Sequence, residues 1–188
     1  MTQKLFIPVL LGTVRQGRRS ERVARFLVEQ LESRADIETT LIDPRDMYLP
    51  MTDEGQDLKE KNTEYRDTII RADALVIVAP EYNHSFSGSL KRVLDVLYDE
   101  YQNKAVGIAG VSTGPWGGAR AIEALLPVVR ELGLIVSDES MQITKVRDEF
   151  PEDGDMPNRA DWEKRAQLFV DRLVWLAHAL KMKSTQSS

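Results

Sequence analysis

Three loops of this sequence combine glycines with side chains that could bind an anionic or planar ligand. They read GTVRQGRRS at 12–20, PEYNHSFSG at 80–88 and GVSTGPWGG at 110–118. Each follows a short, continuously apolar segment, a pattern typical of a strand that is buried on both faces. The chemistry of the chain is therefore expected in these three loops.

The first loop has the composition of a phosphate-binding loop. It supplies the hydroxyls of Thr13 and Ser20 and the guanidinium groups of Arg15, Arg18 and Arg19. Arginine forms bidentate, charge-assisted hydrogen bonds with phosphate oxygens. Ser20 is a predicted N-cap, and the helix that it opens would offer free N–H groups and a favourable dipole to an anion. A solvated basic turn has the same composition, so both interpretations stay open at this point.

The second loop could lie against a planar ligand. Pro80 is predicted to end the preceding strand, and Tyr82 offers a flat amphipathic ring. Successive backbone N–H groups in this loop could donate to the acceptors of such a ligand. The alternative is a sharp strand-to-helix turn in which Asn83 and His84 bond their own backbone.

The third loop contains the pattern G-x-S-x-G, which between a strand and a helix is typical of a hydrolase nucleophile elbow. Ser112 would be the nucleophile, and Asp138 and His178 follow in the chain order of such a triad. His178 lies in the apolar helical stretch VWLAHAL, however, and the sequence has no HGGG-type oxyanion loop. The other interpretation is that the small residues of this loop let a planar ligand approach the backbone closely.

Five apolar segments alternate with five helical segments along the chain. Strands are predicted at 5–11, 37–42, 74–79, 105–111 and 134–136, with helices at about 20–31, 58–72, 89–98, 119–133 and 161–181. This alternation predicts an α/β fold, a flavodoxin-like three-layer sandwich whose five-stranded parallel sheet, of order 2-1-3-4-5, carries helices on both faces. In that order the three loops meet in one crevice at the carboxyl ends of the strands. Residues 1–182 are predicted to form a single domain and 183–188 a frayed tail.

The composition argues against several other functions. The 188 residues carry a net charge of -5 without a long basic cluster, which makes nucleic acid an unlikely partner. The absence of cysteine excludes disulfides and thiolate chemistry, and two widely separated histidines give no metal-ligand spacing. The apolar run at 5–11 is too short to span a membrane and lacks the layout of a signal peptide. No membrane association and a cytoplasmic location are therefore expected.

From about Lys4 to Ser140 the sequence resembles the NAD(P)H-dependent FMN reductase family of flavodoxin-like proteins. The most specific part is PEYNHS followed by G-x-L-K, at Pro80–Ser85, Gly88, Leu90 and Lys91. GTVR is similar to the family's G-S-x-R phosphate loop, with Thr13 in place of the usual serine and the hydroxyl retained. VSTGPWGGARA is similar to the third flavin loop, whereas Ser87 stands where many members have proline, which is expected to loosen the second loop.

The resemblance implies an NAD(P)H-dependent FMN reductase. Such an enzyme takes hydride from NADPH or NADH onto FMN and passes electrons to a small-molecule acceptor such as a flavin or a quinone. The cofactor-binding residues that it implies are Thr13, Arg15, Arg19 and Ser20 for the phosphate, Pro80, Glu81, Tyr82, Asn83 and His84 along the isoalloxazine, and Ser112, Gly114, Gly117 and Gly118 on the other side of the ring. No side chain is expected to be an obligatory acid or base, because the flavin carries the chemistry.

The resemblance also implies a homodimer or homotetramer, and Tyr98, Tyr101 and Trp116 could form an aromatic patch at its interface. Two other functions stay open at this point. One is a serine hydrolase that uses the elbow at Gly110–Gly114, and the other is a non-enzymatic electron carrier of the flavodoxin type.

Overall fold

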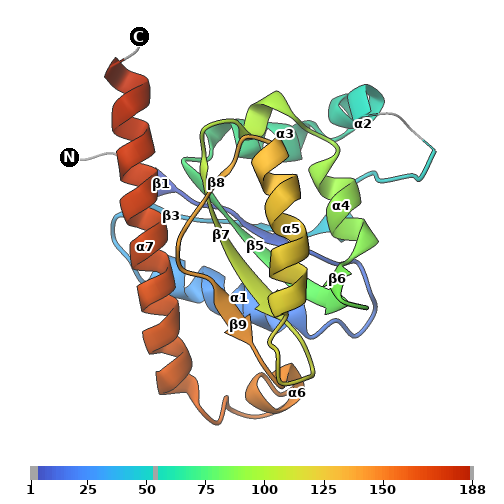
Figure 1. Ribbon diagram of the computed structural model, residues 1–188, viewed down its shortest axis with the longest axis vertical. Helices are drawn as coiled ribbons and strands as arrows, with labels where there is room; N and C mark the ends of the chain where they lie inside the picture. The colour runs from blue at the N-terminus through green and yellow to red at the C-terminus, as the bar shows by residue number, and fades with distance from the viewer. Residues whose placement is uncertain (1–3, 53–54, 187–188) are drawn as a thin grey trace.

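A parallel sheet forms the centre of the computed structural model, which describes residues 4–52 and 55–186 (Figure 1). The main sheet has seven strands in the order β4-β2-β5-β7-β8, with β6 paired to β5 and β9 paired to β7. A separate two-stranded sheet joins β1 and β3. The strands are β1 (Leu5–Phe6), β2 (Val9–Leu11), β3 (Ile37–Glu38), β4 (Leu41–Ile42), β5 (Ala74–Tyr82), β6 (Ser85–Phe86), β7 (Ala105–Val111), β8 (Ile135–Val136) and β9 (Met141–Ile143).

The predicted parallel α/β layering is confirmed, but the prediction of five uninterrupted strands is wrong. The segment at 5–11 is split into β1 and β2 around Pro8, which has no N–H with which to continue the hydrogen-bond ladder. The segment at 37–42 is split alongside it, so that β3 pairs with β1 and β4 with β2. The last predicted segment contains β8 alone. β9 is an additional strand beyond it, and β6 adds an antiparallel one. The main sheet therefore has seven strands in place of the predicted five.

β5 continues through Pro80 to Tyr82, where the sequence predicted a loop. Two residues before Pro80, the carbonyl of Val78 accepts a bond from the N–H of Gly12 at 2.9 Å, on the side of β2. Pro80 faces that same side, because backbone groups of alternate residues point the same way. β2 has already ended at Leu11, so no ladder bond there requires the N–H that proline lacks.

Helices cover both faces of the sheet (Figure 1). One face carries α1 (Ser20–Glu32) and α7 (Arg159–Gln186), and the other carries α3 (Thr63–Arg71), α4 (Gly88–Leu94) and α5 (Ala119–Glu131). In β5, Val76 and Val78 face the first layer while Leu75 and Ile77 face the second, as a continuously apolar strand requires. The shorter elements are α2 (Gly55–Lys61), α6 (Val146–Glu149) and the 3-10 helices η1 (Pro44–Asp46) and η2 (Asp99–Tyr101).

Several helix boundaries differ from the predicted ones. The single helix predicted at 58–72 is divided at Asn62, whose buried side chain bonds backbone groups of Tyr48 and Leu58. α7 extends to Gln186, past the predicted domain limit at 182, and residues 187–188 of the predicted tail lie outside the described residues. None of the helices within the described ranges is both long enough and apolar enough to cross a membrane.

Candidate functional site

The three loops lie at the carboxyl ends of adjacent parallel strands, as the strand alternation predicted. β5 is flanked by β2 and β7, with Leu11 beside Val78 and Val111 beside Pro80. The segments that follow these three strands therefore start next to one another at one edge of the sheet, the usual position of a ligand in a parallel α/β fold.

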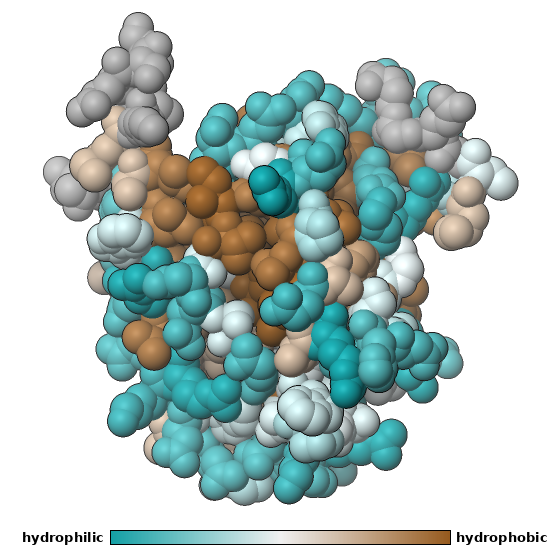
Figure 2. Space-filling view, in the orientation of Figure 1, coloured by the Kyte–Doolittle hydropathy of each residue, from teal (hydrophilic) through white to brown (hydrophobic). Residues whose placement is uncertain are grey.

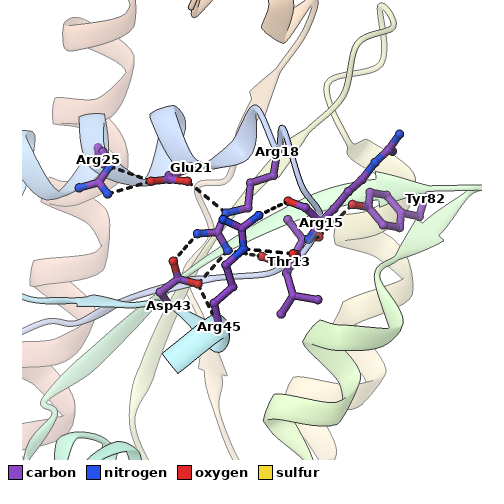
Figure 3. Close-up of polar contacts among 9 residues, drawn as sticks. Thr13, Arg15, Arg18, Glu21, Arg25, Asp43, Arg45 and Tyr82 are labelled. Carbon is purple, nitrogen blue, oxygen red and sulfur yellow. Dashed lines mark hydrogen bonds and ion pairs between the residues drawn. The ribbon is translucent and has the colours of Figure 1, made fainter. Parts of the chain in front are cut away.

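Thr13 connects the first loop to the end of β5 (Figure 3). Its hydroxyl is buried, lies 2.9 Å from the hydroxyl of Tyr82 and accepts the backbone N–H of Arg15 at 3.2 Å. A threonine hydroxyl can accept two hydrogen bonds and donate one. When Tyr82 is the donor, the hydrogen of the Thr13 hydroxyl is left for an anion held by the loop.

The guanidinium of Arg15 and the hydroxyl of Ser20 are two further hydrogen-bond donors that a ligand could use. The exposed guanidinium of Arg15 lies 5.9 Å from the centre of the Tyr82 ring and forms no ion pair within the described part of the chain. The Ser20 hydroxyl is buried and has no hydrogen-bond partner among the described residues. The prediction that Ser20 is the N-cap is wrong, because Arg19 takes the cap position with helical backbone angles and Ser20 is the first residue of α1. The hydroxyl is therefore not used for capping and lies where a helix N-terminus favours an anion.

Arg18 belongs to the scaffold of the first loop. Its buried guanidinium forms a bidentate ion pair with Asp43 and donates to the carbonyl of Thr13 at 2.7 Å (Figure 3). Burial, the largest single influence, would raise the pKa of Asp43. The hydrogen bonds from Arg18 and from the backbone N–H of Arg45, together with the charges of these two arginines, outweigh it and lower the pKa. Arg45 donates to the carbonyl of Arg15 at 2.7 Å. The segment after β4 thus braces the backbone of the first loop from the neighbouring strand.

A buried serine at the start of α4 holds the first loop as well. The Ser87 hydroxyl caps α4 by accepting the N–H of Leu90 at 3.1 Å, and it donates to the carbonyl of Gly12. Proline at this position could form neither bond, so the serine ties the two loops together, and the expectation that it loosens the second loop is wrong. Gly12 is itself required, because a Cβ there would lie 2.5 Å from the carbonyl oxygen of Val78.

The second loop is the end of β5 followed by a tight hairpin. Asn83 and His84 have φ values of 50° and 68°, as in a two-residue type I′ turn, and both are exposed. Glu81 and Tyr82 are partly buried. One carboxylate oxygen of Glu81 lies 3.3 Å from Arg120 in the first turn of α5, and the other is buried without a partner among the described residues. Tyr82 and the turn are thus the part of this segment that is open to a ligand.

Two glycines of the third loop are required by the protein's own packing. A Cβ on Gly117 would lie 2.7 Å from a side chain of β9, one on Gly118 would lie 2.3 Å from the nitrogen of Val111, and both residues have positive φ. Gly114 differs, because the nearest group to a Cβ there is the Ser112 hydroxyl, 4.0 Å away. Open space for a ligand therefore lies at Gly114, whereas Gly117 and Gly118 shape the loop.

The residues of the hydrolase alternative lie apart. The Ser112 hydroxyl donates to a carbonyl of its own loop at 3.1 Å. Asp138 is exposed and bound to Arg172 at 2.9 Å. His178 is exposed on the C-terminal half of α7, which Figure 1 shows at the end of the molecule away from the loop at 112–118. Asp138 and His178 therefore do not form a triad with Ser112.

The predicted aromatic surface patch loses one of its three members. Tyr98 and Trp116 are exposed, but Tyr101 is fully buried and its hydroxyl is hydrogen-bonded to that of Tyr65. Burial is the main cause that raises the pKa of Tyr101 well above its ordinary value. Tyr101 therefore belongs to the core, because it fills the space between η2 and α3, and it is absent from any surface patch.

Sequence reasoning missed the residues that brace the first loop, namely Asp43, Arg45 and Ser87. A signal for the first two existed, since the predicted strand order places the end of 37–42 directly beside the end of 5–11. A cavity of about 760 Å³ runs along α7, and one of about 360 Å³ adjoins the first loop at Gly17 and Arg18. Neither is lined by any of the predicted site residues. Within the described ranges, no three potential metal-ligating side chains lie together.

Loops that meet at the carboxyl ends of neighbouring parallel strands lie where flavodoxin-like proteins bind their ligands. The family model of the NADPH-dependent FMN reductases matches residues 6–147, and the chain therefore belongs to that family. It is accordingly an FMN-dependent NAD(P)H oxidoreductase, which confirms the enzyme class and the cofactors that the resemblance implied. The FMN-dependent NADPH-azoreductase of Staphylococcus aureus is 29% identical over 177 residues, covering 88% of this chain and 92% of that protein.

Solved structures of lower identity support the fold alone. The flavoenzyme NAD(P)H:(acceptor) oxidoreductase FerB from Paracoccus denitrificans is 21% identical and gives a TM-score of 0.75 over 92% of this chain and 97% of that one. A point mutant of flavodoxin from Pseudomonas aeruginosa is 16% identical, with a TM-score of 0.55 over 87% of this chain and 99% of that one. Both place the chain in the flavodoxin-like fold.

Proposed function

We propose that the first loop holds the phosphate of FMN through Thr13, Arg15, Arg19 and Ser20. The observation that carries this proposal is the buried hydroxyl of Ser20 at the N-terminus of α1, which has no partner among the described residues. A phosphate oxygen there would give that hydroxyl an acceptor and would face the dipole of the helix. The guanidinium of Arg15 would add a charge-assisted bond from the loop's exposed side.

The isoalloxazine is proposed to lie along the edge formed by Pro80, Glu81, Tyr82, Asn83 and His84, with Ser112, Gly114, Gly117 and Gly118 on its other side. The open space in front of Gly114 supports a ring at this place. The positive φ values of Asn83 and His84 turn their backbone groups sharply at the end of β5, where donors to ring acceptors are needed. Arg120 holds the Glu81 side chain toward α5, so it leaves the ring side of the segment clear.

The proposed reaction is hydride transfer from NADPH or NADH to bound FMN, followed by electron transfer to a quinone, an azo compound or a free flavin. The flavin supplies the redox chemistry, while the protein binds, orients and tunes it. Thr13, Arg15 and Ser20 would fix one end of the cofactor, and Tyr82 would border the face or edge that a second substrate approaches. The azo-compound acceptor is proposed from the name of the Staphylococcus relative. A cytoplasmic location is proposed as well, from the membership of the NADPH-dependent FMN reductase family.

The test of this function is a visible absorption spectrum of the purified protein with added FMN, followed by anaerobic NADPH and, separately, NADH. Flavin bands near ~450 nm that shift on binding and bleach with nucleotide support the proposal. FMN that stays free at millimolar protein, or bound FMN that neither nucleotide bleaches, contradicts it. Loss of the bleached state on adding a quinone or an azo dye under anaerobic conditions identifies the class of acceptor.

A homodimer or homotetramer of a single domain spanning 1–182 is proposed as the working form. Figure 2 shows an apolar area over β8 between α5 and α7, where Ile135 is an exposed large apolar residue. Tyr98 and Trp116 supply further exposed aromatic surface on other elements. Light scattering measures the molar mass of the purified protein in solution and thus its oligomeric state. A mass of two or four times the 21.3 kDa of one chain supports the proposal, and a mass of 21.3 kDa contradicts it.

A further inference from the structure

An acidic side chain from a distant part of the chain reaches the proposed phosphate loop. The carboxylate of Glu152, in the segment between α6 and α7, lies 2.8 Å from the guanidinium of Arg19 and 3.5 Å from that of Arg22. Arg19 is one of the residues proposed to bind the FMN phosphate. Glu152 therefore pairs with a cation that is proposed to bind the cofactor.

The backbone near Glu152 is fixed by the core. Phe150 is buried and packs against the rings of Phe26 in α1 and Trp162 in α7, at centroid distances of 5.6 and 5.5 Å. Its carbonyl accepts a hydrogen bond from Arg22 at 3.0 Å. The Glu152 side chain itself is 66% exposed. The core thus places this carboxylate beside the loop, while the side chain keeps the freedom to leave Arg19.

We propose that Glu152 competes with the FMN phosphate for Arg19 and thereby weakens the binding of FMN, so that the flavin is exchangeable rather than permanently held. This inference rests on the proposed function of the loop. A carboxylate and a phosphate dianion both form ion pairs with a guanidinium, and they repel each other when they are brought together. When FMN binds, Glu152 must therefore move away from Arg19, or the repulsion between the two anions lowers the affinity for FMN.

The surroundings give the displaced carboxylate another position. The cavity of about 360 Å³ that adjoins the loop is lined by Glu152, by Arg22, and by Arg25, which already pairs with Glu21 at 2.8 Å. Arg22 already lies 3.5 Å from Glu152, so a small rotation exchanges one guanidinium for the next. Glu152 can therefore open the site without unfolding its segment.

The test compares the dissociation constants of FMN and riboflavin, measured by quenching of flavin fluorescence, for the wild-type protein and Glu152→Gln. Riboflavin lacks the phosphate, so it reports on the ring site alone. We expect Glu152→Gln to bind FMN about three- to tenfold more tightly, as for the loss of an exposed ion pair and its repulsion of phosphate. Its affinity for riboflavin should equal that of the wild type. At about 0.5 M salt the gain for FMN should shrink, because the Debye length falls to a few ångströms.

Asp153→Asn is the matched control, since it removes one exposed charge from the next residue, for which no contact with Arg19 is observed. It should change FMN affinity less than Glu152→Gln does. In an Arg19→Gln background the effect of Glu152→Gln should largely disappear, because the competed cation is gone.

Unchanged FMN affinity in Glu152→Gln, or an equal gain for riboflavin, overturns the inference. If FMN binds the wild type and Arg15→Ala weakens it while Glu152→Gln does nothing, only this inference fails. If neither flavin binds the wild-type protein, the proposed function fails and the inference with it.

Discussion

The hydroxyl of Ser20 gives the most direct test of a single residue. It is buried at the first turn of α1 with no partner among the described residues, a situation that costs about 1–3 kcal/mol. We expect Ser20→Ala to leave the free energy of unfolding of the flavin-free protein unchanged or raised by about 1 kcal/mol. The same change should weaken FMN binding about tenfold. Urea unfolding without flavin and a titration with FMN measure the two effects, and a clear loss of stability without flavin would contradict the assignment.

Arg15 is expected to act on the phosphate alone. Its side chain is exposed, and its described side-chain contact is the face of the Tyr82 ring. A charge-assisted hydrogen bond is worth about 1.5–3 kcal/mol, so Arg15→Ala should weaken FMN binding by about ten- to a hundredfold. Stability should stay within about 0.5 kcal/mol of the wild type, as for other exposed positions. Equal losses for FMN and riboflavin in parallel titrations would instead place Arg15 at the ring.

Arg15 and Arg18 show what the sequence could and could not tell at this scale. Both lie in the same basic loop, and residue type alone makes both candidates for a phosphate. Arg18 turns inward because Asp43, 25 residues later, accepts a hydrogen bond from its guanidinium. The order of the strands brings Asp43 to this loop. The composition of the loop therefore identifies it as basic, but does not show that Arg15 is open to a ligand and that Arg18 is structural.

At the scale of elements, the brace between the first loop and the segment after β4 should control stability. Asp43→Asn leaves the buried guanidinium of Arg18 with Glu21 as its remaining acidic partner. Breaking a buried ion pair costs about 3–5 kcal/mol, and the retained Glu21 contact and the partial exposure of Asp43 reduce this to about 2 kcal/mol. FMN affinity should fall as well, because Arg18 holds the carbonyl of Thr13. Urea unfolding and an FMN titration measure both losses.

The free energy of unfolding measured at acidic pH provides the control for the ion pair between Arg18 and Asp43. The pKa of Asp43 is lowered in the folded protein, so its contribution is fully present above the unfolded value of about 3.9. It is lost as the pH falls through the lowered folded value. The stability difference between the wild type and Asp43→Asn should therefore be constant from neutral pH down to about 5 and shrink below about 4. A difference that vanishes already near neutral pH would show that the ion pair is not its cause.

The hairpin at the end of β5 makes a second prediction at this scale. His84 has a φ of 68°, which glycine adopts without strain and a β-branched residue does not. His84→Gly should keep or raise stability by up to about 1 kcal/mol, whereas His84→Val should lose about 1–2 kcal/mol. NADPH oxidation should persist in His84→Gly, because no side chain is expected to act as an acid or base. Thermal unfolding and steady-state rates of the pair measure this, and an inactive but stable His84→Gly would make His84 a chemical participant.

The same hairpin explains why the elements were only partly predictable. The apolar run ALVIVA predicts a strand, and Pro80 predicts its end, because the sequence does not show that β2 stops short of Pro80. β3, β4 and β8 are two residues long, so their existence depends on neighbouring strands rather than on local propensity. The alternation of strands and helices therefore predicts that the three loops meet at one edge of the sheet. It does not predict the pairing of the two-residue strands, which depends on tertiary contacts.

At the scale of the whole molecule, alternating apolar and amphipathic segments were enough to predict a parallel sheet between two helical layers. That inference works because each strand must be apolar on both faces, as Val76 and Leu75 in β5 illustrate by packing into different layers. The site follows from the same geometry, since neighbouring parallel strands bring their following loops to one edge. The Ser87 bond to Gly12 and the contact of Glu152 with Arg19 come from segments without a comparable pattern, and they required the three-dimensional structure.

A cofactor that contacts the segments after β2, β5 and β7 should stabilise the molecule as a unit, because unfolding any central strand dismantles the site. A ligand at about one hundred times its dissociation constant adds about 2.7 kcal/mol to the free energy of unfolding. For a chain of this size, each kcal/mol raises the unfolding midpoint by roughly 2–4 °C. We therefore expect FMN at that concentration to raise the midpoint by about 5–10 °C in calorimetry. Riboflavin at the same absolute concentration should give a smaller increase, since it lacks the phosphate, and Arg15→Ala should reduce the FMN increase to nearly that of riboflavin. Equal increases for the two flavins would mean that the ring alone joins the three segments and that the first loop is a solvated turn.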